Sequence, residues 1–119
     1  MIEEGIDTRN RDKEPDVQQV VLINVFTPKP GKLDELIAFQ AEELRRFMRE
    51  CGFPGWLGSR GHRSIDGSKA VNVTVYDSIE AHDVLKERVD FSQHRRKIED
   101  LVESVEGGFY TVVESVRRP

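Results

Sequence analysis

The first clear pattern in the chain is a run of apolar residues, Val20–Phe26, which a single amide, Asn24, interrupts. Apolar side chains fall on both alternations of this run, which predicts a β-strand that is covered on both faces. The segment Pro28–Gly31 ends the strand. A helix is predicted next over Lys32–Glu50, because core positions recur every three or four residues. These positions are Leu33, Leu36, Ile37, Gln40, Leu44, Phe47, Met48 and Cys51.

A hairpin follows this helix. Gly52 and Pro54 end the helix, and two further strands are predicted over Trp56–Ser64 and Lys69–Tyr76. Asp66-Gly67 between them is a dipeptide that is typical of a tight hairpin turn. The two strands are therefore expected to pair antiparallel.

A second helical region begins at a capping box formed by Asp77 and Glu80. It is predicted to break near Val89-Asp90 and to resume from Phe91. Its apolar positions are Ala81, Val84 and Leu85 before the break and Ile98, Leu101, Val102 and Val105 after it. The region is therefore read as two helical pieces.

Gly107-Gly108 is predicted to turn the chain into a last strand, Phe109–Val116. The order strand, helix, hairpin, helix, strand predicts an α+β, ferredoxin-like βαββαβ fold with a four-stranded antiparallel sheet. Helices cover one face of such a sheet, and no element of the chain is left for the other face. A second copy is the simplest cover, so we expect a homodimer in the form of a dimeric α/β barrel.

Composition narrows the classes of protein to which the chain can belong. Residues 1–18 are rich in charge and poor in large side chains, which predicts a flexible arm before a single domain at 19–119. The net charge of −4, without a basic cluster, argues against a nucleic-acid partner. Cys51 is the only cysteine, so no internal disulfide is expected. No apolar run is long enough to span a membrane and no signal peptide opens the chain, which predicts a cytoplasmic protein without a membrane partner.

Two of the predicted strands have one aliphatic face and one mixed face. The aliphatic faces are Val71, Val73 and Val75 in one strand and Val21, Ile23 and Val25 in the other. The mixed faces are Asn72, Thr74 and Tyr76, and Leu22, Asn24 and Phe26. We expect the aliphatic faces to meet the helices and the mixed faces to line a small-molecule pocket on the side left over. His94, beside Phe91 on the apolar side of the last helix, is expected to join this pocket.

Each polar candidate also has a structural interpretation. A strand asparagine often satisfies a backbone group at an edge or loop, and Tyr76 also fits a core or a dimer interface. His94 fits a hydrogen-bonded structural residue, while His62 and His82 are expected on solvent-facing surfaces. The three histidines have no carboxylate at ligand spacing, so no metal site is predicted. The sequence contains no nucleophile motif, phosphate loop or nucleotide fingerprint.

Five segments together carry a recognisable family pattern. They are Leu22–Phe26, Cys51–Gly55, Val71–Ser78, Phe91–His94 and Gly108–Thr111. Through them the sequence, over about Val20 to Val116, resembles the antibiotic biosynthesis monooxygenase superfamily. Within that superfamily it is most similar to the cofactor-independent anthrone oxygenases of aromatic polyketide biosynthesis.

This resemblance implies a site and a reaction. In those oxygenases an asparagine of the first strand matches Asn24, and a second one, in the third strand, matches Asn72. A tryptophan four residues later is replaced here by Tyr76. The implied catalytic residues are Asn24, Asn72 and Tyr76, and the implied substrate-binding residues are Leu22, Phe26, Thr74, Phe91 and His94. The implied reaction oxidises a polycyclic, anthrone-like phenol to a quinone with O₂ as co-substrate and without a metal or flavin.

Two other functions fit the same pattern. The superfamily contains haem-degrading enzymes that pair a first-strand asparagine, present here as Asn24, with a tryptophan that this chain lacks at that position. A haem-binding protein is therefore a minor alternative. The other alternative is a dimeric domain that binds a small aromatic molecule without turning it over.

Overall fold

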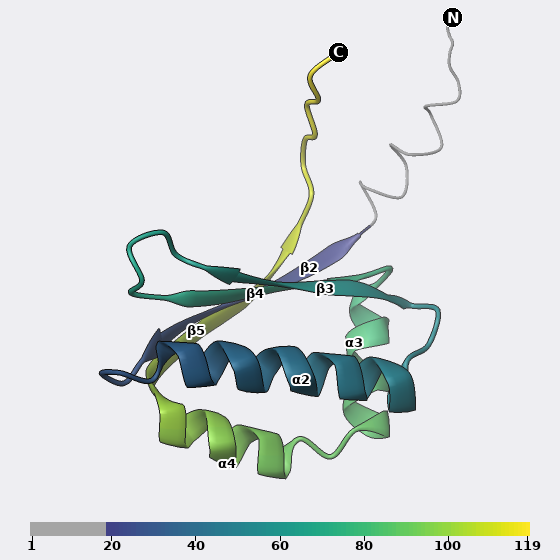
Figure 1. The fold of residues 1–119 in the computed structure, drawn as a ribbon. Helices are drawn as coiled ribbons and strands as arrows, with labels where there is room; N and C mark the ends of the chain where they lie inside the picture. The colour runs from purple at the N-terminus through teal and green to yellow at the C-terminus, as the bar shows by residue number, and fades with distance from the viewer. Residues whose placement is uncertain (1–18) are drawn as a thin grey trace, which may run out of the picture.

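The computed structural model describes residues 19–119, and the predicted arm at 1–18 lies outside the described residues. The elements are β2 (Val20–Pro28), α2 (Leu33–Cys51), β3 (Trp56–Arg63), β4 (Ala70–Tyr76), α3 (Ile79–Arg88), α4 (Ser92–Leu101) and β5 (Val102–Thr111). The four strands form one antiparallel sheet in the order β3-β4-β2-β5. All three helices lie on one side of this sheet (Figure 1). The predicted βαββαβ, ferredoxin-like order is confirmed.

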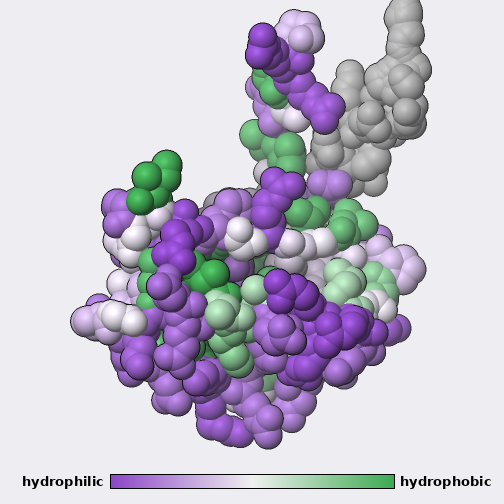
Figure 2. Space-filling model, viewed as in Figure 1, coloured by the Kyte–Doolittle hydropathy of each residue, from purple (hydrophilic) through white to green (hydrophobic). Residues whose placement is uncertain are grey.

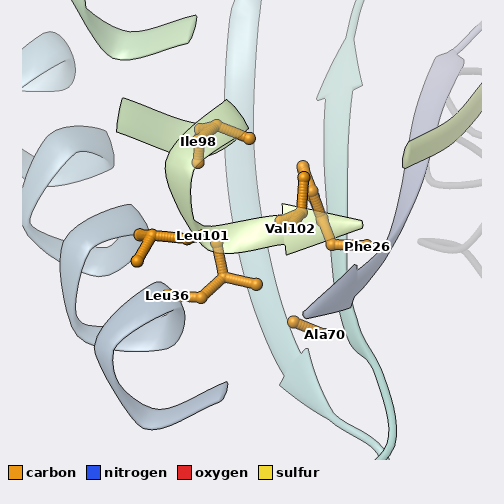
Figure 3. Packing of buried hydrophobic residues seen from close by; sticks show 6 residues of the cluster. All are labelled: Phe26, Leu36, Ala70, Ile98, Leu101 and Val102. Atoms are coloured by element: carbon orange, nitrogen blue, oxygen red, sulfur yellow. The ribbon is translucent and has the colours of Figure 1, made fainter. Parts of the chain in front are cut away.

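The core lies between the sheet and the helices and consists of two clusters. One joins α2 and α4 to the sheet; its buried members are Phe26, Leu36, Ala70, Ile98, Leu101 and Val102 (Figure 3). The other lies under α3; its buried members are Phe47, Trp56, Tyr76, Ala81, Leu85 and Val89. The charged outer faces of the helices make the lower part of the molecule largely hydrophilic in Figure 2. None of the helices described is long and apolar enough to cross a membrane.

The prediction of which sheet face meets the helices was wrong. Phe26, Thr74 and Tyr76 of the mixed face are buried against the helices, whereas the valines of the opposite face are only partly buried. The reason is side-chain size, because the space between a helix layer and a sheet is filled better by phenylalanine and tyrosine than by valine. The aliphatic face is therefore the face that none of the helices within residues 19–119 covers. We call it the open face: Val21, Ile23, Val25, Val71, Val73 and Val75.

The last strand also differs from the prediction. It begins at Val102 and ends at Thr111, so Val102 and Val105 belong to the strand and not to the helix. Gly107-Gly108 lies inside the strand rather than in a turn, because Gly107 pairs with Asn24 of β2. Pairing with β2 along the length of the strand outweighs the local turn preference of the two glycines. The residues after Thr111 run away from the body of the molecule (Figure 1).

The helical region breaks where the sequence predicts, since α3 ends at Arg88 and α4 begins at Ser92. The cap of α3 is not the predicted Asp77. Ser78 is the N-cap residue, and its Oγ accepts a hydrogen bond of 3.2 Å from the backbone N–H of Ala81. A serine three residues before a helical N–H makes the same cap as an aspartate, so the helix shifts by one residue.

Candidate functional site

A cavity of about 530 Å³ lies on the helix side of the sheet, within the usual range of roughly 300–1,000 Å³ for small-molecule sites. Its lining is mainly apolar and includes members of both core clusters. The eight candidate residues all line it: Leu22, Asn24, Phe26, Asn72, Thr74, Tyr76, Phe91 and His94. The structure thus brings these residues together, on the side of the sheet opposite to the one expected.

Asn24 and Asn72 are direct cross-strand partners on β2 and β4, so their side chains emerge next to each other on the cavity face. A glycine flanks each of them on the neighbouring strand: Gly61 of β3 pairs with Asn72, and Gly107 of β5 pairs with Asn24. A Cβ on Gly107 would overlap Oδ1 of Asn24, and one on Gly61 would lie 3.5 Å from Oδ1 of Asn72. Each Oδ1 thus lies over its glycine, and the Nδ2 group, on the other side of Cγ, is directed away from it.

Neither asparagine amide is used to hold the protein together within residues 19–119. The side-chain hydrogen bonds among cavity-lining residues there join Trp56 to Ser59 and Ser59 to Thr74, and none involves Asn24 or Asn72. A structural asparagine would be expected to hold a backbone or side-chain partner. The two amides therefore present hydrogen-bonding groups to whatever fills the cavity.

Tyr76 is 2% exposed, and burial raises the pKa of its hydroxyl to about 12. The phenol therefore stays neutral and keeps its proton as a hydrogen-bond donor. Trp56 of β3 is the cross-strand partner of Tyr76 and also lines the cavity. An indole is thus present one strand away from the position at which the family resemblance expects one.

The hydroxyl of Thr74 is already engaged within the protein. Its Oγ1 lies 2.9 Å from Oγ of Ser59, which in turn accepts a 3.2 Å hydrogen bond from Nε1 of Trp56. This chain of contacts fixes the indole at the cavity wall. Thr74 thus supports the wall, and its free hydrogen-bonding capacity is smaller than that of the asparagines.

His94 is held at the helix end of the cavity by a carboxylate. Its Nδ1 lies 3.1 Å from Oε1 of Glu43 on α2, and its ring stacks on Phe39 at 5.3 Å between centroids. Arg46 binds the same carboxylate through two hydrogen bonds of 3.0 Å, which lowers the pKa of Glu43. Burial lowers the pKa of His94, so its neutral form is favoured. Because a carboxylate only accepts, the neutral ring carries its proton on Nδ1 and leaves Nε2 with a free lone pair.

Sequence reasoning did not assign every polar cavity residue, and His82 and Gln40 are two that it missed. His82, predicted on the helix surface, lines the cavity and lies edge-on to Phe109 at 4.8 Å between centroids. Gln40, assigned only to the helical stripe, is 4% exposed, and its buried Nε2 atom has no hydrogen-bond partner among the described residues. The polar residue on an otherwise apolar stripe is the signal that could have identified Gln40. No comparable signal exists for His82, because its position depends on how α3 packs against β5.

His82 and His94 are the cavity side chains that could ligate a haem iron. Within residues 19–119, no group of three or more histidine, cysteine, aspartate or glutamate side chains is placed to hold a metal ion. The polar groups of the described cavity are amides, hydroxyls, two imidazoles and the charged side chains of Lys86, Arg95 and Glu99.

No family model matches the sequence, and no curated protein matches it either. Solved structures do match. SnoaB, a cofactor-independent oxygenase from Streptomyces nogalater, superposes with a TM-score of 0.71 at 22% identity, over 85% of this chain and 99% of that one. A protein of Shewanella oneidensis gives a TM-score of 0.66 at 29% identity, over 79% and 90% of the two chains. A Nitrosomonas europaea protein whose name places it among the antibiotic biosynthesis monooxygenases gives 0.68 at 19% identity, over 81% and 91%. These matches show a shared fold along nearly the whole length of the relatives.

Proposed function

We propose that this chain, which has the fold of the antibiotic biosynthesis monooxygenases, is a cofactor-independent monooxygenase that oxidises an anthrone-like polycyclic phenol to a quinone. The observation that carries the proposal is the pair of adjacent asparagine amides, free of protein partners within the described residues, in a largely apolar cavity. SnoaB, which shares this fold, is a cofactor-independent oxygenase, and this supports oxygen chemistry without a cofactor. The resemblance in the strand segments supports an aromatic polyketide as the class of substrate.

The reaction balances without a redox cofactor because the substrate supplies the electrons. An anthrone loses a proton to give an electron-rich anion, which passes one electron to O₂. The substrate radical and superoxide then combine to form a C–O bond, and protonation gives a hydroperoxide. Cleavage of the O–O bond with loss of the remaining C–H proton releases water and leaves the new carbonyl of the quinone. The protein is needed to exclude water, align the ring and stabilise charge as it develops on oxygen.

The cavity residues divide between these tasks. Asn24 and Asn72 donate hydrogen bonds to the phenolate or peroxide oxygen, where fixed donors act most strongly. Tyr76 offers a neutral hydroxyl and a ring on which the substrate stacks. Leu22, Phe26, Thr74, Phe91 and His94 form the binding walls. Gln40 supplies a further amide for an oxygen substituent of the ligand.

The open face supports a homodimer as the working form. Its six aliphatic residues form two adjacent rows across β2 and β4, and no helix in the described part of the chain covers them. A second copy packed face to face would remove this surface from water. The cavity lies on the other side of the sheet, so each copy keeps its own site. The cytoplasm stays the location that the sequence predicts.

Oxygen uptake tests the proposed function directly. With dithranol as an anthrone probe, we expect the protein to consume O₂ faster than the uncatalysed background and to form the quinone in equal amount. An oxygen electrode and the quinone absorbance measure the two quantities on the same sample. Uptake that stays at background with dithranol and several other polycyclic phenols would contradict the proposal. Tight binding of these compounds without uptake would instead indicate a non-enzymatic binding domain.

Haem binding is the second candidate, and the observation that favours it is the presence of His82 and His94 in the cavity lining. Titration with haemin distinguishes it from the first candidate. A saturable shift of the Soret band that is lost in His82→Ala or His94→Ala would favour haem. The proposed oxygenase predicts neither the shift nor its loss.

Replacement of Gln40 by leucine is expected to stabilise the empty protein and to weaken ligand binding. The substitution keeps the volume and removes a buried donor that has no partner within residues 19–119, and such a donor costs about 1–3 kcal/mol. The thermal unfolding temperature is therefore expected to rise by several degrees. The dissociation constant for an anthraquinone is expected to increase. Gln93→Leu on the exposed surface of α4 is the control, for which neither change is expected. A fall in the unfolding temperature of Gln40→Leu would mean that the amide has a partner in solution.

A further inference from the structure

The proposed reaction begins with the loss of a proton, and among the described residues the sheet side of the cavity holds no group to accept it. Asn24 and Asn72 are amides, and the hydroxyl of Tyr76 stays protonated. On the helix side, His82, His94 and the exposed Glu99 line the cavity, and His94 has its Nδ1 hydrogen-bonded to the carboxylate of Glu43 at 3.1 Å. Within residues 19–119, Nε2 of His94 makes no hydrogen bond, so its lone pair is free for a ligand.

We propose that His94 is the general base that takes the central-ring hydroxyl proton of the substrate in its anthrol tautomer, and that Glu43 is the residue that positions it. This inference rests on the proposed function and adds a catalytic group to it. The arrangement has the two parts that such a base needs, a cavity-lining imidazole and a carboxylate that fixes its tautomer. The ring is also held by aromatic neighbours, with Phe47 at 5.5 Å and Phe91 at 6.1 Å between centroids.

Glu43 is suited to the positioning role because it is itself held in place. Two hydrogen bonds from Arg46 fix the carboxylate, and its side chain is 13% exposed. When His94 accepts a proton, the carboxylate beside Nδ1 stabilises the imidazolium that forms. The charged groups that act on His94 are Glu43 and Arg46 of α2 and Arg95 of α4. Burial has the largest effect and lowers the pKa of His94, the two arginines lower it further, and Glu43 raises it.

The proton has a complete path in the reaction. Nε2 of His94 removes it from the central-ring hydroxyl of the anthrol tautomer, in which the carbon to be oxidised carries one hydrogen, and the resulting anion reduces O₂ by one electron. After the radical and superoxide combine, the imidazolium returns the proton to the peroxide anion. The ring is neutral again when the O–O bond breaks and water leaves. No further oxidant or reductant is needed, because O₂ accepts all the electrons that the substrate loses.

Replacement of His94 tests the proposal with dithranol as the probe. His94→Gln is expected to lower kcat by about 100-fold, which is the lower end of the usual contribution of a general base. His62→Gln, on the exposed edge strand β3, is the control and is expected to keep the wild-type rate. In His94→Ala, added imidazole is expected to restore part of the rate, and the restored rate should follow the concentration of unprotonated imidazole. A structural histidine would give no such rescue.

A second variant keeps His94 and changes only its partner. Because the base must be unprotonated, the rate falls as pH drops through the pKa of His94, which burial holds below its usual value of 6.5. Glu43 raises that pKa, so Glu43→Gln is expected to move the acid limb of the kcat/KM profile to lower pH and to reduce kcat. Glu42→Gln, one residue away on the exposed side of α2, is the control and should leave the limb in place. This comparison stands even where His94 variants fail to fold.

The outcomes separate this proposal from the proposed function. If wild type consumes O₂ and His94→Gln stays within threefold of it, the oxygenase stands and the base assignment is wrong. If the acid limb of the kcat/KM profile stays in place in Glu43→Gln, the positioning role of Glu43 is wrong. If wild type consumes no O₂ above background, the oxygenase and the base assignment fall together. A 100-fold loss with imidazole rescue and a shifted limb would support both.

Discussion

Asn24→Ala and Asn72→Ala are each expected to lower kcat for an anthrone by roughly 100-fold, the typical cost of losing one fixed donor to a developing oxyanion. The fold should survive, because within the described residues neither amide holds a protein partner whose loss would destabilise it. Since the two amides are adjacent and serve the same oxygen, the double variant should lose less than the product of the two single effects. Oxygen uptake and thermal unfolding on the same preparations measure rate and stability together.

Two glycine variants supply a matched comparison. Gly107→Ala places a Cβ where Oδ1 of Asn24 lies, so the amide must move and the rate should fall as in Asn24→Ala. Gly108→Ala, on the opposite face of β5, meets only Tyr110 at 3.4 Å and should leave the rate unchanged. If the asparagine variants unfold at much lower temperature and keep the wild-type rate per folded molecule, the amides are structural.

Most elements of the fold could be predicted because their signals are local. The Asp66-Gly67 turn, the proline and glycine breaks and the helical stripe of α2 all act over a few residues. The beginning of β5 could not be predicted in this way. Val102 and Val105 fit a helical spacing after Ile98 as well as they fit a strand, and pairing with β2 decides between the two. That pairing is a long-range interaction that no local pattern contains.

The candidate site also shows the difference between features set by local sequence and features set by long-range packing. Alternation along β2 and β4 groups Asn24 with Asn72 on one face, because the period of a strand is two. Alternation does not say which face the helices cover. The expectation that the aliphatic face meets the helices was wrong, because the mixed face does. Trp56 and His82 enter the cavity through the register of β3 and the packing of α3, which the sequence does not encode locally. Their contribution could be identified only from the arrangement of the elements.

The open face leads to the prediction that the protein is a dimer. A single charged substitution on this face is expected to dissociate the dimer into monomers. The wild type is expected to have a mass of about 27 kDa by light scattering at micromolar concentration, twice the 13.7 kDa of one chain. Val73→Asp places a carboxylate in the middle of the two aliphatic rows, where pairing of the faces would bury it without a partner. Because burying an unpaired charge costs several kcal/mol, we expect a monomer of about 14 kDa.

Ile65→Asp is the matched control, since Ile65 is fully exposed in the turn between β3 and β4 and lies outside the open face. Its mass should equal that of the wild type. The cavity lies on the other side of the sheet from Val73, so the Val73→Asp monomer should still bind an anthraquinone wherever it stays folded. A wild type that is monomeric at micromolar concentration would contradict the prediction and require another cover for the aliphatic rows. A Val73→Asp variant that stays dimeric would place the interface elsewhere on the molecule.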